Sequence, residues 1–253
     1  MSSVTHGLRR RLLLPAWQAG LVVTSAGVAG RLPTELLEGA DDQVPVCGAV
    51  QDRDGTPSAA AQATFAVAAG PLRLLLRAGT PYRRRLTMIG LGDELGASLA
   101  RDVDAPEAAR PVEHSVFSLE LLADEIQRCL PVVPLDSSSN SRLRRADPAL
   151  LLAATSGHSS MTPGRVAAGA PAEVITALGA SYDASLEVTA IHDGPPLLVD
   201  RLLWFAADGH WWHARPDSDE RGNPTLDVTP VEPDDLPGAV APLLSGLLMA
   251  ATT

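Results

Sequence analysis

The sequence predicts an α+β protein with a central, mostly antiparallel sheet flanked by helices. Two observations favour this class: short apolar runs alternate with tight polar turns, and a unit of such runs occurs twice, at 72–130 and 186–248. Each unit closes with an amphipathic helix, expected at 121–130 and at 236–248. Duplicated units usually pack about a pseudo-two-fold axis, so we expect two quasi-two-fold related halves within one compact domain.

The strands of the two units correspond in order. The matched segments are 85–93 with 201–209 and, after a polar turn, 95–102 with 210–217. This alignment places Leu86 opposite Leu202. In the second unit apolar side chains occupy both faces, because Leu202, Trp204 and Ala206 alternate with Leu203, Phe205 and Ala207. Such a strand is covered on both sides or exposes one apolar face to a partner.

The chain divides into three parts. An N-terminal half is expected at 1–131, a helical connector at 132–183 and a C-terminal half at 184–253. Three arginines and three leucines at 9–14 look like the start of a secretory signal, but Pro15, Trp17 and Gln18 interrupt the apolar run. We therefore expect a structured, retained N-terminal segment.

Composition excludes several classes of function. A net charge of −10 argues against nucleic acid, whose phosphates require a basic face. No apolar stretch is long enough to span a membrane, so membrane insertion is not expected. Cys47 and Cys129 lie far apart without a metal-binding or redox spacing, which favours reduced thiols and a cytoplasmic location.

No recognisable catalytic motif is present, so we expect neither an enzyme nor a cofactor. His210 and His213 are three residues apart, which on a strand places them on opposite faces and makes a poor zinc pair. His158 precedes a serine but lacks a nucleophile elbow. Gly90 and Gly92 lack the strand–loop–helix context of a nucleotide site. A hydrolase that uses His158 or the His210/His213 region is the least favoured alternative.

A cluster of large aromatic residues stands out in a chain with only 4% aromatic residues. Its members are Trp204, Phe205, Trp211 and Trp212. Desolvated aromatics dominate the energetics of protein interfaces. We therefore take these four side chains as candidate anchors for a protein partner, with packing in the core as the alternative.

The repeated unit resembles the EspG family, the chaperones associated with ESX (type VII) secretion in actinobacteria. Two regions carry the likeness. The first is 79–131, with the apolar run 86–89, Gly92-Asp93, Gly96 and the stretch 117–131. The second is 202–248, with the turn at Asp208-Gly209 and the segment 229–236, which leads into the last helix. The resemblance covers about two-thirds of the chain and lies in the pattern of elements rather than in an invariant signature.

The resemblance implies a mixed α+β fold, quasi-two-fold halves and no enzymatic activity. It also implies a cytoplasmic chaperone or adaptor that covers the apolar tip of a helical-hairpin client, either PE/PPE-like or WXG-like, before export. Monomer and dimer remain open. The alternative is an interaction domain with another partner, which a different set of co-purifying proteins would reveal.

Overall fold

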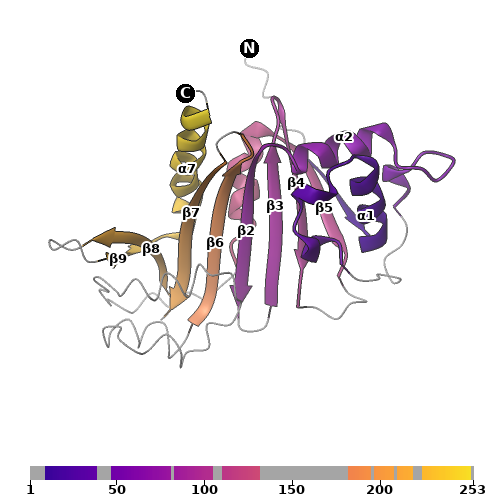
Figure 1. The fold of residues 1–253 in the computed structure, drawn as a ribbon. Helices are drawn as coiled ribbons and strands as arrows, with labels where there is room; N and C mark the ends of the chain where they lie inside the picture. The colour runs from indigo at the N-terminus through magenta and orange to yellow at the C-terminus, as the bar shows by residue number, and fades with distance from the viewer. Residues whose placement is uncertain are drawn as a thin grey trace, which may run out of the picture.

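The computed structural model describes residues 9–38, 47–80, 83–104, 110–131, 182–194, 197–207, 210–218 and 224–251. Within these residues, nine strands form one sheet in the order β1-β5-β4-β3-β2-β6-β7-β8-β9, shown in Figure 1. Every neighbouring pair of strands is antiparallel. The α+β class and the antiparallel sheet expected from the sequence are therefore confirmed.

Apolar, β-branched and small residues dominate the central strands, which suits a sheet covered on both faces. The strands of the first half are β1 (Arg9–Leu14), β2 (Leu72–Thr80), β3 (Arg83–Leu91), β4 (Leu95–Asp102) and β5 (Val112–Ser118). Those of the second half are β6 (Tyr182–His192), β7 (Leu198–Ala207), β8 (His210–Ser218) and β9 (Pro224–Val231).

Helices connect and cover these strands. The α-helices are α1 (Ala16–Ser25), α2 (Ala59–Ala68), α3 (Leu122–Gln127) and α7 (Leu236–Ala251). The short 3-10 turns are η1 (Ala29–Arg31), η2 (Thr34–Leu36), η3 (Gly48–Val50), η5 (Leu119–Leu121) and η6 (Pro233–Asp235). The Ser58 hydroxyl caps α2 by accepting a hydrogen bond from the Ala61 amide, which satisfies a helix-terminal donor.

Both halves of the sheet follow the same path. In each, four strands form an antiparallel meander, β2 to β5 or β6 to β9, and a 3-10 turn then leads into a helix, α3 or α7. The halves meet where β2 pairs with β6, with Leu75 opposite Thr189. The strand order expected from the repeat is present, while the quasi-two-fold relation between the halves stays a prediction.

The residue-by-residue alignment of β3 with β7 is wrong in one respect. Leu86 packs in the cluster beneath α1 and α2, whereas Leu202 packs in the cluster beneath α3 and α7. These clusters lie on opposite faces of the sheet. Neighbouring residues of a strand point to opposite faces. The alignment by residue type therefore pairs β3 residues of one face with β7 residues of the other face.

The core consists of two layers separated by the sheet. Strand β2 shows the division, because Leu75 belongs to the layer beneath α1 and α2, and its neighbours Leu74 and Leu76 belong to the layer beneath α3 and α7. All three leucines are buried. Helices therefore cover both faces, which explains the near-continuous apolar character of the central strands.

Helix α2 lies very close to the sheet. A Cβ atom at Gly90 would lie 1.8 Å from the Val67 carbonyl oxygen near the end of α2, so only glycine fits there. Gly90 pairs with Ala97 on β4, which is also small. The glycines of this segment thus allow helix–sheet contact, in agreement with the sequence argument against a nucleotide loop.

The N-terminal segment contains two elements that the sequence did not predict. Strand β1 forms one edge of the sheet by pairing with β5, and α1 follows at once, with Pro15 as its N-cap. The arginines of β1 suit an edge strand, because charged side chains discourage pairing with another sheet. Most of the predicted connector, 132–181, lies outside the described residues; Tyr182 already belongs to β6.

Candidate partner-binding surface

Two of the four candidate aromatics lie in the core. Trp204 and Trp211 are buried in the layer beneath α7, and their ring centroids are 6.4 Å apart. His213 lies on the same side, 6.4 Å from Trp204, because β7 and β8 pair Trp204 with His213. Trp204 and Trp211 therefore support the helix from below and present no surface to solvent.

The other two candidates lie on the opposite face. Phe205 and Trp212 follow Trp204 and Trp211 in their strands and pair with each other across β7 and β8. Both are buried, at 3% and 1% exposure. None of the four aromatics is therefore exposed in this structure, so an exposed partner site has to be sought elsewhere in the second half.

Helix α7 covers one face of the strands in that half. Its inner stripe packs on β6 and β7 and consists of the buried residues Leu236, Val240, Leu244 and Leu247. The spacing of three and four residues places them on one side of the helix. In η6, which leads into α7, the Asp235 carboxylate accepts a hydrogen bond from the Glu232 amide within a capping box.

The outer side of α7 has an unusual composition. The helix contains no charged residue along its 16 residues, although the chain has 50 charged residues among 253. Its exposed positions are Gly238, Ala241, Pro242, Ser245, Gly246, Leu248 and Met249. Leu248 and Met249 are 50% and 73% exposed. Exposed apolar groups of this kind mark interaction sites more often than isolated surface leucines do.

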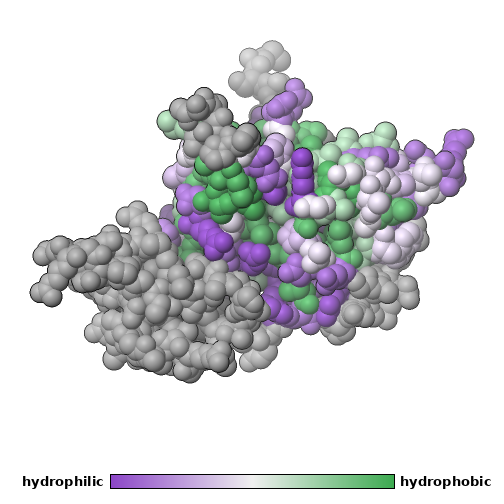
Figure 2. All heavy atoms as spheres, viewed as in Figure 1, coloured by the Kyte–Doolittle hydropathy of each residue, from purple (hydrophilic) through white to green (hydrophobic). Residues whose placement is uncertain are grey.

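Apolar residues also gather close to α7 in the space-filling view, beside hydrophilic side chains (Figure 2). The small residues of the outer side let a second helix approach closely, because the distance between packed helices depends on the side chains at the contact. We take the outer side of α7 as the candidate partner-binding surface, and refer to it below as the α7 outer face.

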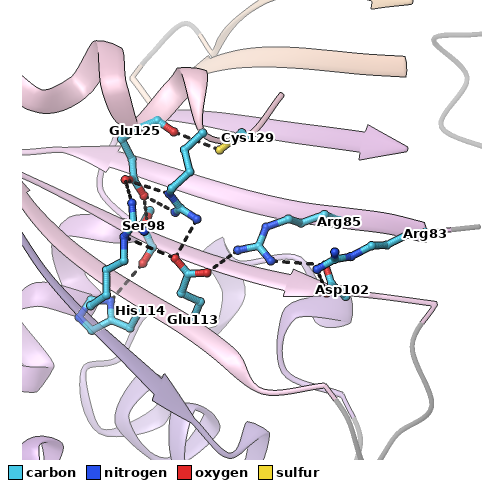
Figure 3. Close-up of polar contacts among 10 residues, drawn as sticks. Arg83, Arg85, Ser98, Asp102, Glu113, His114, Glu125 and Cys129 are labelled. Carbon is cyan, nitrogen blue, oxygen red and sulfur yellow. Dashed lines mark hydrogen bonds and ion pairs between the residues drawn. The ribbon is translucent and has the colours of Figure 1, made fainter. Parts of the chain in front are cut away.

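The position of α3 beside α7 depends on a buried carboxylate. Glu125 is fully buried and accepts hydrogen bonds from the Ser98 hydroxyl at 2.8 Å and from Arg128 at 2.5 Å. Arg11 on β1 adds an ion pair to Glu125 at 3.6 Å. The carboxylate is thus compensated by groups from β1, β4 and α3, which anchors the helix to the sheet (Figure 3).

A second carboxylate extends this network along the sheet. Glu113 on β5 pairs with Arg128 at 2.8 Å and with Arg85 at 2.6 Å. Arg85 also contacts Asp102 on β4 at 3.4 Å (Figure 3). Arg85 on β3 and Arg128 at the end of α3 pair with carboxylates on β4 and β5, so the network fixes the relative positions of β3, β4, β5 and α3. Within this network Asp102, Glu113 and Glu125 each have an arginine partner, which indicates a structural role.

His114 is a buried histidine on the other face of the sheet. Its Nδ1 lies 3.1 Å from the Ser98 carbonyl oxygen and its Nε2 3.0 Å from the Thr64 hydroxyl. A carbonyl only accepts, so in the neutral ring Nδ1 carries the proton and Nε2 is the acceptor that faces the Thr64 hydroxyl, which also lies within hydrogen-bond distance of the Ala61 carbonyl oxygen. Phe65 contacts the ring at a centroid distance of 4.4 Å. Burial lowers the pKa of His114 to about 4.

This pKa predicts a loss of stability in mild acid. The unfolded chain takes up a proton at His114 near its ordinary pKa of 6.5, whereas the folded chain does so only near 4. Stability therefore falls as the pH falls through this window, by roughly 3 kcal/mol in total from this residue. Urea unfolding at pH 7 and pH 4 should show a smaller difference for His114→Gln than for the unchanged chain. Equal pH dependence in both proteins would contradict the prediction.

The residues of the hydrolase alternative are not brought together in the described structure. His158 lies outside the described residues. In the β7–β8 register His210 pairs with Ala207 and His213 with Trp204. Among the described residues, no group of three or more metal-ligating side chains occurs. Both cysteines are free, and burial raises the pKa of Cys129 to about 11.

Two comparisons with known proteins returned no match. Neither a scan against protein-family models nor a search of curated proteins found one. No helix in the described part of the chain is long and apolar enough to cross a membrane. The fold and the surface together define an α+β protein with a charge-free helix on the outside of its second half.

Proposed function

We propose that the protein is a cytoplasmic, non-enzymatic chaperone or adaptor that binds a helical-hairpin client through the α7 outer face. The observation that carries the proposal is the combination of an uncharged 16-residue helix with exposed Leu248 and Met249 on an otherwise acidic chain. A helical-hairpin tip exposes apolar side chains, and covering them removes aggregation-prone surface.

The assignment to type VII secretion, with a PE/PPE-like or WXG-like client, rests on the resemblance to the EspG family. The strand order is compatible with that family's expected architecture, since both halves form a meander that ends in a helix. The buried aromatics Trp204 and Trp211 then have a supporting role, because they hold α7 in position for the client.

The proposal predicts a selective loss of binding. Replacing Leu248 and Met249 with glutamate places charges on the α7 outer face, and we expect client affinity to fall at least tenfold, since anchor residues contribute about 2 kcal/mol or more. Titration calorimetry with a purified PE–PPE pair or WXG-type hairpin from the same organism measures the effect. The melting temperature should change little, because both side chains are exposed.

The matched control is Trp17→Glu, which changes an exposed apolar residue on α1 instead. Client binding should be unchanged in this variant. Undiminished binding in the Leu248/Met249 variant would rule out α7 as the client surface. If none of the hairpin proteins binds the unchanged chain, the proposed function itself is wrong.

A further inference from the structure

The two edges of the sheet differ in their capacity to accept a further strand. β1 and β9 stand at the ends of the strand order, so each has one edge without a strand partner among the described residues. β9 contains Pro224 and Pro230, which have no N–H group to donate. β1 contains no proline from Arg9 to Leu14, so each of its residues keeps its N–H group. The outer edge of β1 is therefore the one suited to strand addition.

The sequence of β1 has two blocks, three arginines followed by three leucines. Arg10 is exposed and has no ion pair within the described part of the chain. Arg11 pairs with Glu113 and Glu125, and its side chain remains 39% exposed. In the second block Leu13 is 57% exposed. The strand thus offers positive charge at one end and apolar surface at the other, on a chain whose net charge is −10.

These two blocks select an acidic strand over a second copy of the chain. In an in-register antiparallel pair of two β1 strands, each arginine would face a leucine, which compensates none of the charges. In a parallel pair, arginine would face arginine. A strand with three apolar residues followed by three acidic ones matches both blocks when it runs antiparallel to β1. The arginines that discourage pairing with a neutral edge therefore favour this partner.

We propose that the outer edge of β1 binds an extended segment of a partner protein as an added antiparallel strand, with apolar side chains opposite 12–14 and carboxylates opposite Arg10 and Arg11. Backbone hydrogen bonds supply affinity, and the two blocks supply specificity. β6, on which α7 packs, is five strands away from β1, roughly 24 Å at the usual strand spacing. The site is separate from the α7 outer face and does not rest on the client proposed above.

Fluorescence anisotropy of the full chain with labelled synthetic peptides tests the site. The probe has three valines followed by three glutamates, and the control has the same residues in reverse order. At low salt the probe should bind at least about fivefold more tightly, because only the weaker parallel pairing matches the blocks of the control. Backbone N-methylation at alternate residues of the probe should abolish binding in one phase and spare it in the other, since only every second N–H group of a strand faces its neighbour.

A charge reversal on the strand locates the bound peptide. Arg10→Glu should weaken probe binding about fivefold at low salt, since repulsion replaces attraction at an exposed position. The matched control is Arg53→Glu, which makes the same charge change at an exposed residue between η3 and α2 and should bind the probe as the unchanged chain does. Hydrogen exchange should slow at 9–14 when the probe binds and stay unchanged at 236–251.

Three outcomes would overturn the proposal. The first is a chain that does not bind the probe. The second is binding that depends neither on the order of the blocks nor on the phase of methylation, which would show charge attraction alone. The third is an equal loss of binding in Arg10→Glu and Arg53→Glu. The helical-hairpin client is absent from these measurements, so each outcome leaves the proposed function untouched.

Discussion

Replacing Trp204 with alanine should cost roughly 3–5 kcal/mol of unfolding free energy, because truncating a fully buried tryptophan removes apolar contacts and leaves a cavity. The truncation removes packing in the layer between β7 and α7, where Trp204 contacts Trp211. Urea unfolding followed by circular dichroism measures the change. Trp204→Phe should cost less, since the indole N–H has no acceptor among the described residues.

Met249→Ala provides the comparison from the exposed side of the same helix. It should change the unfolding free energy by no more than about 0.5 kcal/mol, as surface substitutions usually do. A Trp204→Ala protein as stable as the Met249→Ala protein would show that Trp204 is not part of the core. The two variants therefore distinguish residues that hold α7 on the sheet from residues on its outer face.

Replacing Arg128 with methionine should destabilise the protein by about 3–5 kcal/mol, the usual cost of breaking a buried ion pair from one side. Glu125 would remain buried without its closest cationic partner, beside the Ser98 hydroxyl and 3.6 Å from Arg11. Thermal and urea unfolding measure the loss.

The double variant Arg128→Met/Glu125→Leu serves as the control. Removing both charges leaves no uncompensated carboxylate, so most of the stability should return. If the double variant is less stable than Arg128→Met alone, the remaining contacts of Glu125 with Ser98 and Arg11 outweigh the cost of burying its charge.

The order of strands was accessible from the sequence because it depends on local pattern. Apolar runs, turns and a closing helix recur in both units, and the structure shows the same meander in each. Strand β1 was missed because six residues of arginine and leucine carry no alternation. Its partner β5 lies about a hundred residues away, and only the folded chain brings the two together.

The candidate site was likewise only partly predictable from the sequence. The sequence identified the aromatic cluster, and strand alternation correctly placed Trp204 and Phe205 on opposite faces. It did not show that all four aromatics are buried, because a strand apolar on both faces has the same pattern whether or not a layer covers it. The absence of charge in 236–251 was visible in the sequence, but which side of that helix faces outward was not.

By itself, the sequence determined the fold class, the repeated order of strands and the approximate extents of β3, β4, β7, β8 and the two closing helices, because these depend on periodicity and turn residues within short windows. The tertiary structure alone decided the register between the halves, the partners of Glu125 and the exposure of α7. These properties depend on contacts between residues distant in the chain. One residue of register shift reverses the face of every side chain while leaving the local pattern unchanged.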